Sequence, residues 1–284
     1  MKPSKIILGA LGLSFLASIS TPSFAWTRNL TFEDGRVGSQ AQGTASDFDG
    51  ASGGSYITDE RVLRGSKAAK LTVTGGSTAY GEWGGVIDFP RKLGKGDEIW
   101  FSVNTFFPDG FNYDSSGEGS HLKFLRVHVN NSGGSNVGYN DWYINPEASS
   151  IPHKFIFEGQ QQWFTYGAPS DEPQRGTWES YEMYIKFDDV PVDSGGNAIV
   201  RVWKNGQLLR EITGAKTLRN ASDLSDRAHL FTYWNGGAPK TQHMYVDDIV
   251  LTSDTPPYRD AQGNPMATQV GDVSAPAAPD LSIE

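Results

Sequence analysis

Apolar and polar residues alternate along most of this 284-residue chain, in short runs separated by glycine-rich segments. The runs are rich in Val, Ile, Phe, Tyr, Trp and Thr, whereas segments such as "GASGGS", "NNSGGSN" and "DSGGN" are typical of turns. Period-two alternation bounded by turn residues predicts strands. We find no heptads, no internal repeat, and no helical pattern longer than a turn or two near "TLRNASDLSD". The pattern therefore predicts an all-β fold, an antiparallel two-sheet sandwich, rather than βαβ units.

Several runs have one apolar face and one polar face that is rich in rings. The polar faces of "YEMYIKF" and "GYNDWYIN" carry Glu182, Tyr184 and Lys186, and Tyr139, Asp141 and Tyr143, respectively. Asn205-Gly206 predicts a two-residue hairpin turn, because both residue types tolerate a positive φ. These faces indicate sheets that are buried on one side and offer a polar, aromatic groove on the other.

The segment "SHLKFLRVH", residues 120 to 128, spoils this alternation on both faces. A β-bulge near Phe124-Leu125 would restore it by shifting the phase by one residue. The inward residues would then be Leu122, Phe124, Leu125, Val127 and Val129. The groove would receive His121, Lys123, Arg126, His128 and Asn130. A straight edge strand with surface ion pairs is the alternative.

The two ends of the chain differ in composition from the rest. Lys2 and Lys5, the apolar run "IILGALGLSFLASI" and the small residues of "SFA" predict a signal peptide over residues 1–25, with an uncleaved anchor as the alternative. Residues 26–254 form the predicted β domain. Residues 255–284, rich in Pro, Ala, Gly and Asp, predict a disordered tail. We therefore expect a secreted protein, periplasmic or extracellular.

Charge and cysteine content exclude several classes of function. The formal net charge is -9, and loss of Lys2 and Lys5 with the signal peptide makes it -11. An acidic protein is a poor partner for nucleic acid or an anionic membrane. A polyanionic carbohydrate ligand is still compatible with this net charge, because a groove can be locally basic. The chain has no cysteine, which excludes disulfides, thiolate metal sites and a cysteine nucleophile. We expect a monomer without an organic cofactor.

Five segments together resemble a known family. They are "TFEDGRVGS", "LRGSKAAKLTV", "GDEIWFSVNTFFPDGF", "TWESYEMYIKFDDVP" and "FTYWNGGAPKTQHMYVDDIVL". Over residues 30–252 the chain resembles the concanavalin A-like jelly-roll polysaccharide lyases, which include heparin-lyase-like enzymes and alginate, glucuronan and ulvan lyases. The resemblance implies a lyase that cleaves a uronic-acid-containing polysaccharide by β-elimination. The chain lacks those families' Lys-Leu-Pro-Gly-Leu and Gln-x-His cleft signatures, so the polymer does not carry over.

The resemblance also implies candidate catalytic residues. Lys123 lies where some alginate-cleaving members carry a functional lysine, and Tyr139 and Tyr143 are the nearest counterparts of functional tyrosines on a neighbouring strand. β-Elimination needs a group that neutralises the uronate carboxylate, a base for the C5 proton and an acid for the leaving oxygen.

We expect Arg126, with His128 or Asn130, to hold the carboxylate. Lys123 or His121 is the expected base, and Tyr143 or Tyr139 the expected acid. A lysine base needs a lowered pKa, which a nearby arginine and partial burial favour. Further expected substrate contacts are Asp141, Tyr184, Lys186 and Trp234.

Two other functions remain open. The eight tryptophans and eleven tyrosines also suit a non-catalytic, lectin-like carbohydrate-binding module. A glycoside hydrolase would need two carboxyl groups about 5 to 10 Å apart. The chain lacks the E-x-D-x-x-E run typical of hydrolases with this architecture, which leaves Glu182 with Glu179 or Asp141 as the possible pairs.

Acidic residues near the two ends of the predicted domain suggest a metal site. "FEDG" and "YVDDIVL" would lie on neighbouring strands, and carboxylates at strand ends are suitable ligands for a structural Ca²⁺. The candidates are Glu33, Asp34, Asp247 and Asp248. Acidic residues that are merely solvated are the alternative.

Overall fold

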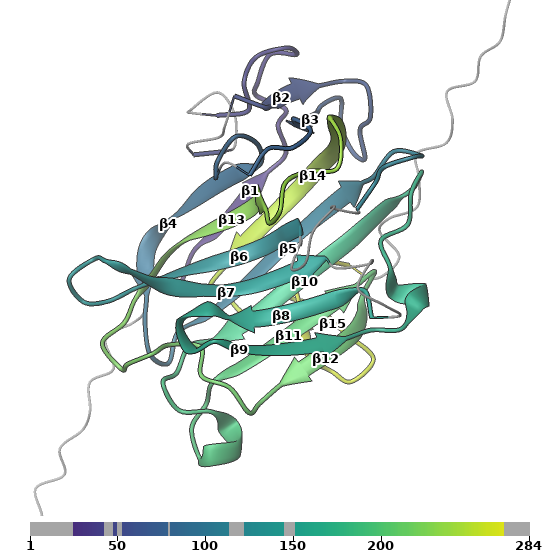
Figure 1. The fold of residues 1–284 in the computed structure, drawn as a ribbon. Coiled ribbons are helices and arrows are strands. Elements are labelled where there is room, and N and C mark those ends of the chain that lie inside the picture. The colour runs from purple at the N-terminus through teal and green to yellow at the C-terminus, as the bar shows by residue number, and fades with distance from the viewer. Residues whose placement is uncertain are drawn as a thin grey trace, which may run out of the picture.

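Two large antiparallel sheets packed face to face make up the molecule (Figure 1). The computed structural model describes residues 25–42, 48–49, 53–78, 80–113, 122–144 and 151–269. Within these ranges there is no α-helix, and the helical segments are three single turns of 3-10 helix: η2 (Glu158–Gln160), η3 (Pro169–Asp171) and η4 (Val192–Ser194). The predicted all-β, two-sheet sandwich is confirmed. No helix in the described part of the chain is both long and apolar enough to cross a bilayer.

The larger sheet has eight strands, in the order β12-β11-β10-β5-β14-β3-β2, with β1 also paired to β14. Their bounds are β1 (Thr27–Leu30), β2 (Ser55–Thr58), β3 (Ala68–Val73), β5 (Glu98–Phe106), β10 (Trp178–Lys186), β11 (Ile199–Lys204), β12 (Gln207–Ile212) and β14 (Gln242–Thr252). Asn205 and Gly206 connect β11 to β12 with φ angles of 49° and 78°, which confirms the predicted hairpin turn.

The smaller sheet has six strands, in the order β4-β13-β6-β7-β8-β9, and lies in front in Figure 1. Their bounds are β4 (Gly85–Leu93), β6 (Leu122–Asn130), β7 (Asn136–Ile144), β8 (His153–Phe157), β9 (Gln162–Tyr166) and β13 (Ser225–Trp234). Each strand turns alternate residues toward the larger sheet, and the others form the outer face of the six-stranded sheet.

Aromatic rings from both sheets meet in the core. The Phe124 ring of β6 lies 5.4 Å from Trp142, 4.9 Å from Phe231 and 4.9 Å from Tyr181 of the opposite sheet, measured between ring centroids. Edge-to-face contacts of this kind add to the free energy gained by burying apolar area. The core therefore fixes the strand that carries the polar residues singled out in the sequence.

The predicted bulge in β6 is confirmed. Lys123 pairs with Tyr143 of β7, but Leu125 pairs with Trp142, so Phe124 is the extra residue. Leu122, Phe124, Leu125, Val127 and Val129 all lie in the core. β6 runs between β13 and β7 in the middle of the sheet, so the alternative of an edge strand is wrong.

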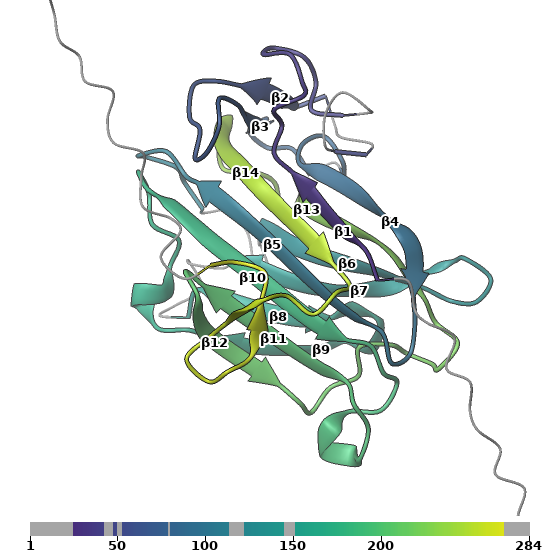
Figure 2. The same cartoon turned by 180° about the vertical axis from the view of Figure 1, so that it is seen from behind.

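The prediction of a disordered tail is wrong for residues 255–269, which we call the C-terminal strap. It contains β15 (Tyr258–Arg259) and β16 (Pro265–Met266) and crosses the outer face of the eight-stranded sheet (Figure 2). Trp203 donates to Asp260 at 2.8 Å, and Met266 is fully buried against rings of that sheet. The strap has few large apolar residues of its own, and most of the cluster that buries Met266 comes from the sheet. Residues 270–284 and the predicted signal peptide up to residue 24 lie outside the described residues.

Candidate functional site

A buried network of charges lies on the outer face of the six-stranded sheet. Arg126 Nε donates to Asp141 Oδ2 at 2.7 Å, and its Nη2 donates to Glu158 Oε1 at 3.1 Å. Lys123 Nζ donates to the same Glu158 oxygen at 2.7 Å, and the Tyr143 hydroxyl reaches it at 3.2 Å. We call these five residues the charge network. Burial by itself would raise the pKa of Glu158, but Arg126 and Lys123 hold it below its usual range.

The cations of the charge network are already paired with carboxylates of the same network. The side chain of Arg126 is only 3% exposed and that of Asp141 is 0% exposed. Lys123 would have to break its ion pair with Glu158 to act as a base, and Tyr143 is 3% exposed. The network can therefore position neighbouring groups, but it offers no free guanidinium for a substrate carboxylate.

A cluster of two tyrosines and two histidines lies beside the charge network, and we call it the Tyr–His cluster. The Tyr139 ring covers the Arg126 guanidinium at 3.7 Å and lies 5.3 Å from the His229 ring. The Tyr80 hydroxyl is hydrogen-bonded to His229 Nδ1, and the His128 ring lies 4.9 Å from Tyr139. Tyr80 as a whole remains 50% exposed, so part of this residue can meet a ligand on this face.

Burial sets the protonation states in the Tyr–His cluster. Burial, together with the positive charge of Arg126, lowers the pKa of His229 well below its usual value, so its imidazole is neutral at pH 7. Partial burial raises the pKa of Tyr80, so its phenol keeps its proton. A protonated hydroxyl held by a neutral imidazole has a proton that it can donate to a ligand.

His128 is held by a carboxylate. Its Nδ1 lies 3.0 Å from Asp226 Oδ1, and the Asn130 amide lies 3.3 Å from the same nitrogen. Burial would raise the pKa of Asp226, but the bond to His128 and the charge of Arg227 hold it below its usual range. A carboxylate on Nδ1 places the proton there and leaves Nε2 as the basic nitrogen. His128 Nε2 has no hydrogen-bond partner within the described ranges.

Arg227 supplies an exposed cation next to these groups. It lies two residues from His229 on β13, its side chain is 40% exposed, and its Nε is 3.2 Å from Asp226. Its charge acts on both Tyr80 and His229. Its Nε also lies 3.4 Å from Asp88 Oδ1, but because its side chain is far more exposed than that of Arg126, Arg227 is better placed to meet a carboxylate of a ligand.

The structure gathers seven of the predicted site residues on this one face. They are Lys123, Arg126, His128, Asn130, Tyr139, Asp141 and Tyr143. His121 lies outside the described residues. Asp141 is fully buried against Arg126, so it cannot touch a substrate as predicted.

Three predicted substrate contacts lie elsewhere. Tyr184 and Lys186 belong to β10 of the other sheet, where Tyr184 packs on Trp100 at 4.8 Å and Lys186 pairs with Glu98 at 3.0 Å. Trp234 is 1% exposed and stacks on Trp83 in the core. The predictions for Tyr184 and Lys186 are wrong because alternation assigns a face to a strand but does not say which sheet the strand joins. The prediction for Trp234 is wrong because this residue of β13 faces the core, after a register shift between Leu230 and Tyr233.

The sequence reasoning missed five residues of the site: Tyr80, Glu158, Asp226, Arg227 and His229. The segment "DRAHLF" does alternate, with Arg227 and His229 opposite Ala228 and Leu230, and this signal could have found two of them. Tyr80 and Glu158 lie outside the strands, where no periodicity marks them.

The carboxyl pairs suggested for a glycoside hydrolase do not converge. Glu182 is fully buried and accepts the backbone N–H groups of Ala267 and Thr268 in the strap. Glu179 lies on the opposite face of β10, paired with Lys204 at 2.9 Å, and Asp141 belongs to the other sheet. These pairs therefore cannot form the catalytic centre of a glycoside hydrolase.

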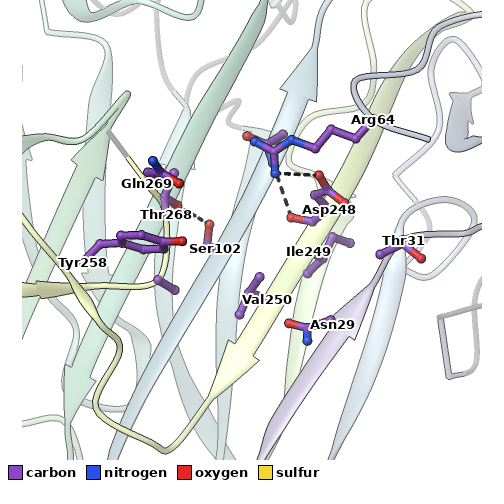
Figure 3. Close-up of a pocket in the computed structure, with 12 residues that line it drawn as sticks. Asn29, Thr31, Arg64, Ser102, Asp248, Ile249, Val250, Tyr258, Thr268 and Gln269 are labelled. Carbon is purple, nitrogen blue, oxygen red and sulfur yellow. Dashed lines mark hydrogen bonds and ion pairs between the residues drawn. The ribbon is translucent and has the colours of Figure 1, made fainter. Parts of the chain in front are cut away.

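A hollow of 330 Å³ lies on the far side of the molecule, on the outer face of the eight-stranded sheet (Figure 3). Tyr258 and Thr268 of the strap form one wall, and Arg64 and Asp248 lie across from them. Arg64 and Asp248 neutralise each other at 3.1 Å, and none of the lining residues is a histidine. His128 and His229 lie on the six-stranded sheet instead.

The carboxylates predicted to bind Ca²⁺ do not fit that ion. Glu33 accepts the N–H groups of Ser66 and Lys67, each at 2.9 Å. Asp247 likewise accepts three N–H groups, and Asp248 pairs with Arg64. Calcium needs a set of oxygen ligands, whereas these carboxylates face hydrogen-bond donors. Among the described residues no three His, Asp or Glu side chains are grouped so that they could hold a metal, and Asp34 belongs to no such group.

Comparison with known proteins gives the fold and no sequence family. No protein-family model and no curated protein sequence matches the chain. Among solved structures, an endo-β-1,4-glucuronan lyase from the fungus Trichoderma reesei superposes with a TM-score of 0.52 at 13% identity, over 79% of this chain and 94% of that one. The alginate lyase Aly36B, in a variant bound to alginate trisaccharide, superposes with a TM-score of 0.55 at 18% identity, over 79% of this chain and 97% of that one. The chain therefore shares the jelly-roll fold of polysaccharide lyases, as its sequence predicted.

Proposed function

We propose that this protein is an exported lyase that cleaves a uronic-acid-containing polysaccharide by β-elimination. The observation that carries the proposal is the Asp226–His128 pair, with Tyr80 and Arg227 nearby on one face. The shared fold supports it, because the glucuronan lyase and the alginate lyase named above act on uronate polymers. Export is proposed from residues 1–25 alone.

The chemistry divides among three groups on this face: Arg227 and Tyr80, which are partly exposed, and His128, whose side chain is 11% exposed. Arg227 pairs with the uronate carboxylate and so makes the C5 proton more acidic. His128 Nε2 removes that proton, the C4–O4 bond breaks, and a C4=C5 double bond forms. Tyr80 donates its hydroxyl proton to the departing O4. The proton on His128 then leaves to solvent, and Tyr80 regains one, which completes the cycle.

The buried residues act as positioning residues. Asp226 fixes the proton on His128 Nδ1, and His229 fixes the Tyr80 hydroxyl. Arg126 lies under the Tyr139 ring, which packs against both histidines. The proposed base differs from Lys123, which is already paired with Glu158, whereas His121, the other base expected from the sequence, lies outside the described residues.

The test measures unsaturated products on a panel of uronate polymers: alginate, glucuronan, ulvan, heparin-like and pectic polysaccharides. We expect an absorbance rise on at least one of them. On that polymer His128→Asn and Tyr80→Phe should each lower kcat by about 10²- to 10⁴-fold, the usual contribution of a general base or acid. His243→Asn and Tyr56→Phe, which lie on other surfaces, are matched controls that should stay active.

The outcomes separate the alternatives. Loss of activity in Lys123→Ala, with His128→Asn still active and both variants folded, would return the base to Lys123. Silence on the whole panel, with retention on one immobilised glycan, would replace the lyase by a carbohydrate-binding module.

A further inference from the structure

We propose that Trp163 and Lys154 form a distal subsite, which holds a uronate unit of the polymer several sugars away from the bond that is cleaved. This inference rests on the proposed function and extends it to substrate length. It predicts an enzyme that works best on long chains.

Trp163 is the most exposed large hydrophobic residue in the described part of the chain. It is 56% exposed, in a protein whose other described tryptophans are half-buried or buried. It lies on β9, whose Phe164 and Tyr166 face inward, so the indole points out from the six-stranded sheet. An exposed indole is a large flat surface on which a sugar ring can stack. One such residue alone would be unremarkable.

A cation lies beside the indole. Lys154 Nζ on β8 lies 5.4 Å from the Trp163 ring centroid. Its ammonium has no acidic partner among the described residues, unlike Lys123 in the charge network. On an acidic protein such an ammonium supplies local positive charge, which favours binding of an anionic ligand. An indole face and an ammonium together match the ring and the carboxylate of a uronate unit.

Strand register places this pair in line with His229 of the Tyr–His cluster. His229 pairs with Arg126, Arg126 with Asp141, and Asp141 with Ile156. Ile156 pairs in turn with Trp163, so one row crosses five strands on the same face. Four strand spacings of about 4.8 Å put Trp163 about 19 Å from His229. A polymer lying across the strands would span both places.

The experiment compares a long polymer with the shortest oligosaccharide that the enzyme still cleaves. Trp163→Ala should raise KM for the polymer about tenfold, the loss expected when one aromatic anchor is truncated. It should leave kcat on the polymer, and both constants on the shortest oligosaccharide, nearly unchanged. Trp163→Phe should recover most of the affinity, and Lys154→Met should raise the polymer KM and weaken its salt dependence. The control is Tyr56→Ala, which removes an exposed ring from the other sheet.

Two results would overturn the subsite. One is an unchanged polymer KM in folded Trp163→Ala. The other is an equal loss on long and short substrates, which would place Trp163 at the cleavage point or in the fold. If the wild-type protein cleaves no polymer of the panel, the lyase proposal fails by itself. Retention of the Trp163→Ala variant on an immobilised uronate polymer then decides the subsite: weaker retention supports it, and equal retention overturns it.

Discussion

Burial changes the proton affinity of single residues on both sides of this molecule. On the six-stranded sheet it keeps His229 neutral and Tyr80 protonated, as the proposed reaction requires. On the other sheet it raises the pKa of Glu182 to about 7, against the effect of two backbone N–H groups of the strap that donate to it. Residue identity alone shows none of these states, because each depends on what covers the side chain.

Glu182 should make the stability of the protein depend on pH. Its pKa is higher in the folded state than in the unfolded chain, where it is near 4.5. A raised acid pKa contributes stability that is fully present below pH 4.5 and is lost as the pH rises through 7. The difference between these two pKa values corresponds to about 3 kcal/mol in the free energy of unfolding.

Glu182→Gln tests this expectation. Urea unfolding of the wild-type protein and the variant at several pH values between 4 and 8 gives the free energy of unfolding for each. The wild-type value should fall relative to the variant as the pH rises. Because Asp247 titrates in both proteins, the difference between the two curves isolates Glu182. Parallel curves would show that Glu182 does not titrate in this range.

Two elements decide where the chemistry can lie. The extra residue in β6 turns Lys123, Arg126 and His128 to one face while the apolar residues around them stay in the core. The strap closes the opposite face by burying the rings of Trp100 and Trp203. One sheet therefore offers its outer face to a ligand, whereas much of the other is covered by the chain itself.

The strap should be a stabilising element. Met266 is fully buried between the strap and the sheet, so Met266→Ala should lower the free energy of unfolding by about 2–5 kcal/mol. Gln262→Ala, at an exposed position of the same strap, should change it by less than about 0.5 kcal/mol. Thermal and denaturant unfolding measure both. A variant Met266→Ala as stable as the wild type would mean that the strap does not pack in solution.

The whole molecule holds its ends together without a metal site among the described residues. Glu33 and Asp247 both bind the segment from Leu63 to Lys67, Asp247 at its start and Glu33 at its end. β1 pairs with β14, so the first and last strands of the large sheet are also neighbours. Backbone N–H groups thus occupy Glu33 and Asp247, two of the carboxylates suggested for calcium by the sequence.

This arrangement predicts that a chelator has no effect on stability. The melting temperature should be the same with excess chelator as with added Ca²⁺, because the carboxylates already face donors. Differential scanning calorimetry makes the comparison, with Mg²⁺ as the control for general salt effects. A melting temperature that falls with chelator and recovers with Ca²⁺, but not with Mg²⁺, would restore the metal site.

Local pattern by itself determined the fold class, the hairpin at Asn205-Gly206 and the kink in β6, because alternation and turn chemistry act between residues close in sequence. Local pattern also placed Arg126, His128 and Tyr139 on one face. Only the tertiary structure decided which sheet each strand joins, which removed Tyr184 and Lys186 from the site, and which face of β13 Trp234 occupies, which placed it in the core.

Tertiary contacts also brought Tyr80 to His229 and Asp226 to His128, over 149 and 98 residues of chain. They folded residues 255–269 onto the rings of Trp100 and Trp203, and they turned Glu33 and Asp247 toward backbone N–H groups. The physical reason is common to all of these cases. Burial and partner choice depend on surfaces that meet only after the two sheets have packed.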